Sequence, residues 1–110
     1  MVRKTFENEI QQLKDEILIL GSMVEQATLD SVAAMKKRDL RWSERIIDND
    51  KQINARRFAL ENRVMIVIAT QQPMARDLRV IASILEVISE LERMGDYAKG
   101  IAVINIRMGD

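Results

Sequence analysis

Residues 6–34, FENEIQQLKDEILILGSMVEQATLDSVAA, decide the fold of this chain. Apolar or small residues recur in them at alternating steps of four and three: Phe6, Ile10, Leu13, Ile17, Leu20, Val24, Ala27, Ser31 and Ala34. A heptad pattern sustained in this way predicts a long amphipathic helix. Four further apolar residues widen the stripe beyond that of a two-stranded coiled coil, which favours a bundle: Leu18, Ile19, Met23 and Leu29.

Two breaks divide the chain into three such helices, at about 5–37, 40–70 and 74–107. Asp39 is the expected N-cap of the second helix, and Pro73 marks the start of the third. The expected seam of the second helix is Ile46, Ile53, Leu60, Val64, Val67 and Ile68. That of the third is Leu78, Ile81, Leu85, Ile88, Gly95, Ala98 and Ala102.

Close backbone approach would explain Gly95 and Gly100 inside the third helix. Short connections imply antiparallel neighbours. We therefore expect one all-α domain over 1–110, an antiparallel up-down-up three-helix bundle.

Composition excludes several classes of function. The 110 residues have a formal net charge of zero, which gives no electrostatic footprint for nucleic acid. They include no Cys and no His, so thiolate chemistry, a His general base and a His- or Cys-based zinc site are excluded. The longest apolar runs are too short to cross a bilayer, and no targeting signal is visible. An intracellular protein is the default reading.

Two acidic or amide pairs have the spacing of one helix face. Glu92 and Asp96 are four residues apart in the third helix, and Asp50 and Asn54 are four apart in the second. If the second hairpin turns near residues 71–74, Asp50 lies level with residue 95 and Asn54 with residue 91. The first hairpin brings Glu25 to about the same level. Five oxygen-bearing side chains from three helices should then meet within about one turn.

Such a cluster has two interpretations. Carboxylate and amide oxygens suit hard or borderline cations, so a divalent or ferric ion is one, with Fe, Zn, Mn, Mg and Ca as candidates. A solvated or ion-paired face is the other. Arg57 projects between Asn54 and Glu61, and Lys99 lies three residues after Asp96, so either cation would neutralise carboxylates here.

Several segments resemble the PhoU family of phosphate-signalling regulators. The third helix carries Gln72-Pro73, Asp77-Leu78-Arg79 and Glu92-Arg93-Met94-Gly95-Asp96. Residues 21–27, GSMVEQA, and residues 50–54, DKQIN, are also similar to that family. Members of this family contain two three-helix repeats in tandem, and the resemblance implies that this chain corresponds to one of them. It also implies acidic motifs, which bind metal clusters in several members. It maps these motifs onto Asp50 with Asn54 and onto Glu92 with Asp96. Asn54 departs from the pattern, since an acid would be the stronger ligand.

The resemblance also implies a role. Family members are cytoplasmic and non-enzymatic, and they repress phosphate uptake and starvation signalling through a phosphate ABC transporter and a sensor histidine kinase. Contact with the membrane would then be peripheral, through these partners. The alternative is a metal-free dimerisation or interaction domain of a transporter or channel regulator. Because the chain matches one repeat, it is either part of a longer protein or a homologue that dimerises. We expect a homodimer that covers residues such as Leu18, Ile19 and Met65.

Overall fold

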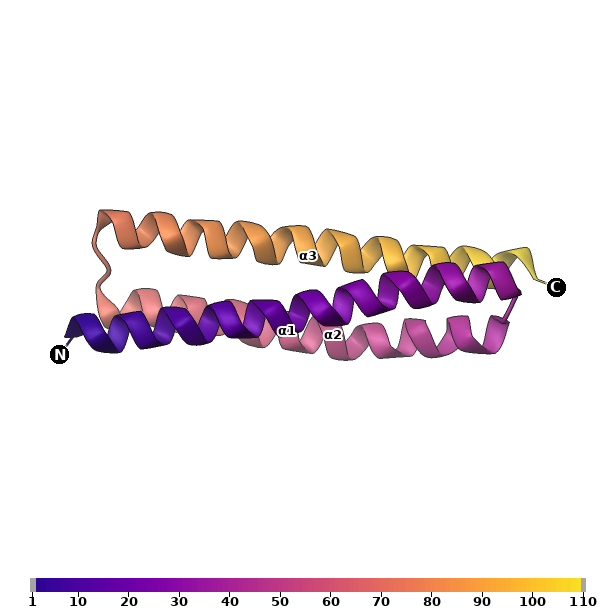
Figure 1. The fold of residues 1–110 in the computed structure, drawn as a ribbon, viewed down its shortest axis with the longest axis horizontal. Coiled ribbons are helices and arrows are strands. Elements are labelled where there is room, and N and C mark those ends of the chain that lie inside the picture. Colours follow the sequence, from indigo (N-terminus) through magenta and orange to yellow (C-terminus); the bar gives the residue numbers. More distant parts are fainter. Residues whose placement is uncertain (1, 110) are drawn as a thin grey trace.

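The computed structural model describes residues 2–109 of the chain, so the terminal residues of the expected 1–110 domain lie outside it. Three helices, α1 (Val2–Lys37), α2 (Leu40–Gln71) and α3 (Ala75–Met108), pack side by side, as Figure 1 shows. Each helix contacts the other two, and the bundle measures 60 × 17 × 17 Å. The all-α bundle is confirmed, and its helix bounds lie within three residues of the expected ones.

Both connections between helices are tight. The Asp39 carboxylate accepts a hydrogen bond from the Trp42 backbone N–H at 3.0 Å, as an N-cap does. The residue that directly follows each of α1 and α2 adopts the left-handed conformation without being glycine: φ is 55° at Arg38 and 46° at Gln72. This conformation costs a non-glycine residue about 1–2 kcal/mol. At Arg38 a hydrogen bond offsets the cost, because its guanidinium donates to Asn105 Oδ1 at 2.6 Å.

The core follows the expected seam in α1 and departs from it at the start of α3. All seam residues of α1 are buried except Ile17, which is half-buried. In α3, by contrast, Leu78 is 44% exposed and Leu85 only half-buried, while Asp77 and Ile84 are buried. The expected seam was therefore wrong at Leu78, whereas Leu85 packs against the core from a half-buried position, as Ile17 does.

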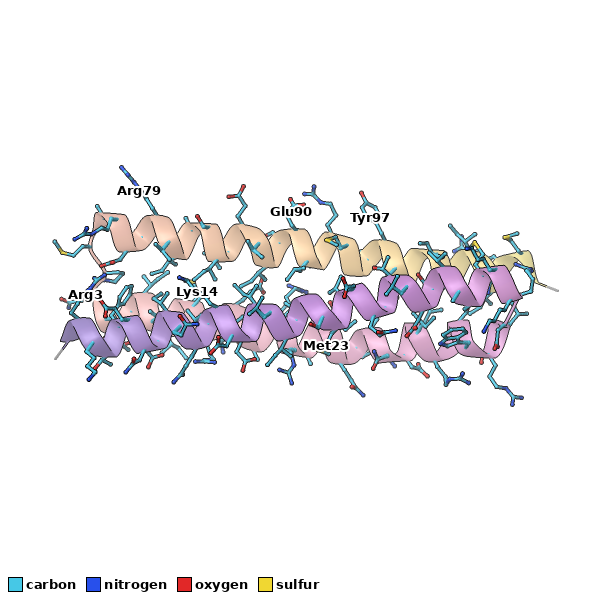
Figure 2. All side chains as sticks on the ribbon, in the orientation of Figure 1. Arg3, Lys14, Met23, Arg79, Glu90 and Tyr97 are labelled. Carbon is cyan, nitrogen blue, oxygen red and sulfur yellow. The ribbon has the colours of Figure 1, made fainter. Side chains whose placement is uncertain are left out.

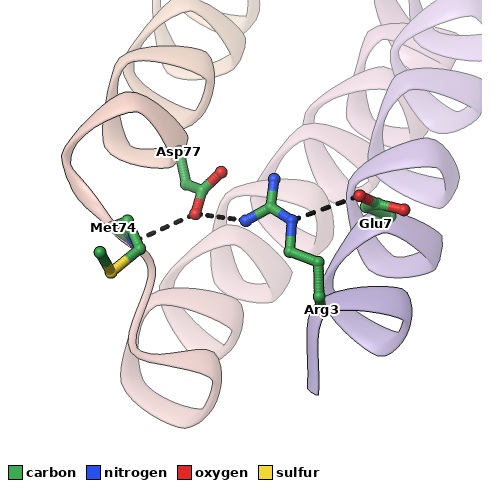
Figure 3. Close-up of polar contacts among 4 residues, drawn as sticks. All are labelled: Arg3, Glu7, Met74 and Asp77. Atoms are coloured by element: carbon green, nitrogen blue, oxygen red, sulfur yellow. Dashed lines mark hydrogen bonds and ion pairs between the residues drawn. The ribbon is translucent and has the colours of Figure 1, made fainter. Parts of the chain in front are cut away.

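Asp77 turns inward because it has two partners there, as Figure 3 shows. Its carboxylate accepts from the Arg3 guanidinium at 2.7 Å and from the Met74 backbone N–H at 3.1 Å. Asp77 thereby caps α3 and ties it to α1. Arg3 also donates to Glu7 at 3.2 Å, within α1.

The glycines of α3 do not mark a close approach. A Cβ at Gly95 would lie 3.9 Å from Val24 Cγ2, which is ordinary van der Waals contact, and a Cβ at Gly100 would meet nothing within 4 Å. The expectation of close backbone approach was wrong at both positions.

One described helix has the length and composition of a membrane span. Residues Arg3–Lys37 include a window with a mean hydropathy of 1.3, of which 28% is buried in the bundle. The expectation concerned the length of uninterrupted apolar runs, which this window does not test. The finding is weak evidence for a membrane span, because the core helix of a bundle passes the same test.

Candidate carboxylate site

The candidate site lies where α2 and α3 face each other, near the middle of the bundle. Residues of α2 are buried at steps of three and four: Ser43, Ile46, Asp50, Ile53, Arg57, Leu60, Val64 and Val67. Two of these core positions carry charge, so the sequence places Asp50 and Arg57 on the inward line of α2.

Asp50 is the most buried carboxylate of the site, with a residue exposure of 4%. Its Oδ2 accepts from the Asn54 amide at 3.0 Å, and the Lys99 ammonium lies 3.8 Å away. Burial raises the pKa of the Asp50 carboxyl, and the nearby charge of Asp96 raises it further. Lys99, Asn54 and Arg57 act in the opposite direction. The ionised carboxylate of Asp50 is therefore only partly compensated by its neighbours.

Arg57 binds two further carboxylates, one on each helix. Its guanidinium contacts Glu92 Oε2 at 3.1 Å across the helix interface and Glu61 Oε1 at 3.1 Å within α2. The same guanidinium stacks on the Phe58 ring, 4.2 Å from its centroid. Its Nε is buried and, among the described residues, has no hydrogen-bond partner.

The structure brings some of the expected residues together and leaves others apart. Asp50 and Asn54 are hydrogen-bonded, and Asp96 lies close enough to Asp50 to affect its pKa. Glu92 is instead bound by Arg57, with 43% of its side chain exposed. Glu25 is exposed on α1.

As arranged, these side chains do not fit a metal centre. Over residues 2–109, no group of three or more Asp or Glu residues is placed to hold an ion. Two cations already occupy the site: Lys99 faces Asp50, and Arg57 bridges Glu92 and Glu61. The arrangement is that of an ion-pair cluster that joins α2 to α3.

Sequence reasoning identified both Arg57 and Lys99 as neutralising groups. Lys99 lies three residues after Asp96 in α3, and its ion pair is with Asp50 on α2. A long side chain on a helix leans toward the N-terminus, which carries the ammonium of Lys99 back toward the level of Asp50.

A second buried polar cluster, near the C-terminal end of α3, was not predicted from the sequence. Asn105 is fully buried and donates to Ser43 Oγ at 2.8 Å and to the Ala34 carbonyl at 3.3 Å. Its position was detectable, because Asn105 continues the seam of Ala98 and Ala102. This cluster joins all three helices.

Comparison with known proteins agrees with the motifs quoted above. The model of the PhoU domain matches residues 7–104. The chain is 41% identical over 103 residues to the phosphate-specific transport system accessory protein PhoU homolog of Clostridium acetobutylicum, covering 93% of this chain and 47% of that protein. It is 36% identical over 96 residues to the accessory protein PhoU of Escherichia coli K12, covering 87% of this chain and 40% of that protein.

A third relative, the PhoU homolog of Streptococcus pneumoniae TIGR4, is 37% identical over 101 residues, or 92% of this chain and 47% of that protein. The chain thus spans less than half the length of each of these relatives. Their names describe accessory proteins of a transport system, not enzymes. Because the domain match covers nearly all of the described helices, this three-helix chain belongs to the PhoU domain family.

Proposed function

We propose that this chain is a non-enzymatic regulator of phosphate homeostasis. In this role it represses phosphate uptake and starvation signalling, acting in the cytoplasm on a phosphate ABC transporter and a sensor histidine kinase. The match of the PhoU domain to residues 7–104 carries the proposal. The names of the curated relatives, accessory proteins of a phosphate-specific transport system, support the transporter as partner.

Complementation tests this function. A bacterium whose own PhoU gene is deleted would express this chain, and phosphate uptake and a phosphate-starvation reporter would be measured in phosphate-rich medium. We expect both to fall toward the levels of the undeleted strain. A helix-breaking variant, Ile88→Pro, is the control for expression without a folded bundle, since Ile88 lies fully buried in α3. Normal accumulation of the chain with no change in either readout would contradict the proposal.

Metal binding is a finer prediction that the ion pairs of the site oppose. A metal ion held by Asp50, Asn54, Glu92 and Asp96, with Glu25 as a weaker ligand, would require Arg57 and Lys99 to give up their carboxylates. The site remains a candidate because Asp50 and Asp96 lie close together and Asp50 is incompletely compensated.

Metal titration decides between this site and an ion-pair cluster. Metal-free protein would be titrated with iron, zinc, manganese, magnesium and calcium ions, beside a variant with Glu92→Ala and Asp96→Ala. If the site binds metal, wild type takes up an ion that the variant does not. Equal uptake by the two proteins would remove the site and favour the second function, a metal-free dimerisation or interaction module of a transporter or channel regulator.

A further inference from the structure

Cationic side chains gather at the end of the bundle where α1 turns into α2 and where α3 ends, at the right of Figure 1. Two lysines end α1, an arginine follows in the turn, and α2 and α3 each add one more arginine. The Arg38 guanidinium donates to Asn105 Oδ1 at 2.6 Å, so the turn lies against the last residues of α3. We define this basic end by five residues: Lys36, Lys37, Arg38, Arg41 and Arg107.

Little negative charge compensates the basic end. Asp39 is the one acidic residue within 36–41, and its carboxylate already caps α2 by accepting from the Trp42 N–H. Arg38 bonds to a neutral amide, and within residues 2–109 no ion pair involves any of the other four cations. Even if Asp110, outside the described residues, is counted with Asp39, the cations outnumber the carboxylates by five to two.

Helix stability accounts for only some of these charges. Lys36, Lys37 and Arg107 lie in the last turns of α1 and α3, where a cation interacts favourably with the helix dipole. Arg41 lies instead at the start of α2, whose first turn contains no acidic residue. Its charge opposes the dipole of α2 and repels the neighbouring cations. A charge that lowers the stability of the isolated chain is typical of a position that serves binding.

The shape and the apolar residues of the basic end fit a flat anionic surface. Its cations come from three helices at the end of a bundle that is 17 Å across, so one sheet of lipid headgroups would meet all of them together. Met108 is 62% exposed there, and the half-buried Trp42 ring has the Lys37 ammonium 5.6 Å from its centroid. Trp is enriched where a membrane meets water, and clustered Lys and Arg bind anionic headgroups.

We propose that the basic end binds anionic phospholipid headgroups directly, so that the bundle stands end-on at a membrane surface. The proposal goes beyond the proposed function and does not rest on it, because the partner is a bilayer without protein. Each Lys or Arg near such a surface contributes about fivefold to the affinity, equivalent to about 1 kcal/mol. The zero net charge does not oppose this attraction, because charges act over about 8 Å at physiological salt and the bundle is 60 Å long.

Co-sedimentation with lipid vesicles tests the contact. Vesicles of phosphatidylcholine alone are compared with vesicles that also contain phosphatidylglycerol, at low and at high salt. We expect wild type to bind only the anionic vesicles, and less at high salt, because salt screens the attraction. Trp42 is the one Trp of the chain, so its fluorescence emission should move to shorter wavelength when the basic end meets the bilayer.

Reversing one charge at each end of the bundle separates this site from the overall charge. Arg41→Glu should lower the affinity for anionic vesicles about tenfold or more, because a repulsive charge replaces an attractive one. Arg79→Glu is the matched control and should bind as wild type does, since Figure 2 shows Arg79 projecting from α3 near the opposite end. Without vesicles, Arg41→Glu should resist urea at least as well as wild type, because it places an acid in the first turn of α2.

Four results would overturn the proposal. They are no binding to anionic vesicles, equal binding to both kinds of vesicle, an equal loss in Arg41→Glu and Arg79→Glu, and a loss in Arg41→Glu that accompanies unfolding. A chain that binds duplex DNA through Arg41 and no vesicle would also overturn it, and would assign the basic end to a nucleic acid. None of these results would affect the complementation test, which measures phosphate uptake and the reporter.

Discussion

Arg57 is the residue that most changes what the carboxylate site can do. It occupies a core position of α2 and is buried, yet it carries a charge that is always present. Its two bonds to Glu61 and Glu92 compensate that charge, and they also occupy a carboxylate that a metal would need. The chemistry of the site therefore depends on one side chain that belongs to neither acidic pair.

Gly100 is predicted to be a position where the wild-type residue lowers stability. It lies inside α3, and a Cβ there would meet nothing within 4 Å. Because Gly is less favourable than Ala in a helix interior by about 0.8–1.0 kcal/mol, Gly100→Ala should raise the free energy of unfolding by up to about 1 kcal/mol. Urea denaturation measures this. A destabilised variant would mean that residue 100 contacts something absent from the isolated bundle.

At the scale of the helices, the sequence predicted α1 well and α3 less well. The seam of α1 is apolar or small at every position, so its phase is unambiguous and the buried residues follow it. At the start of α3, Leu78 and Asp77 compete for the inward position, and hydrophobicity favours Leu78. Asp77 takes it because Arg3, 74 positions away in the sequence, supplies a partner.

The same limit applies to the candidate site. Spacing along each helix identified the acidic and amide pairs, because that spacing depends only on helix geometry. Which cation meets which carboxylate depends on side-chain reach across two helices. For that reason two ion pairs could not be predicted from the sequence: Arg57 with Glu92, and Lys99 with Asp50.

The start of α3 should be sensitive to acid. The hydrogen bond from Arg3, with help from the Met74 N–H and nearby Arg charges, holds the pKa of Asp77 below its ordinary value. Asp77 therefore contributes stability that is present above the unfolded-state pKa of about 3.9 and is lost as the pH falls through the lower folded-state pKa. We predict that Asp77→Asn unfolds more readily at pH 7 and that its difference from wild type shrinks toward pH 2. Thermal unfolding between pH 2 and 7 measures this. A constant difference would show that the ionised carboxylate is not the stabilising form.

Over the whole molecule, polar contacts tie the bundle together at three levels. Arg3 and Asp77 join α1 to α3 at one end, the carboxylate site joins α2 to α3 near the middle, and Asn105 joins all three helices at the far end. An apolar seam alone allows neighbouring helices to shift by one heptad, about two turns, because one heptad packs much like the next. Directional hydrogen bonds between helices fix one register.

Asn105 should be the most costly of these ties to remove. Its amide donates to Ser43 and to the Ala34 carbonyl, and its oxygen accepts from Arg38, whose left-handed backbone this bond helps to hold. We predict that Asn105→Leu lowers the free energy of unfolding by about 1–3 kcal/mol, because it leaves buried polar groups without partners. Urea denaturation at fixed protein concentration measures this, since an associating chain gains stability with concentration. Adding Ser43→Ala to Asn105→Leu should recover part of the loss, because it removes one of the unpaired groups. If Asn105→Leu is as stable as wild type, or if the second substitution only adds a further loss, these hydrogen bonds do not fix the register and the apolar seams alone do.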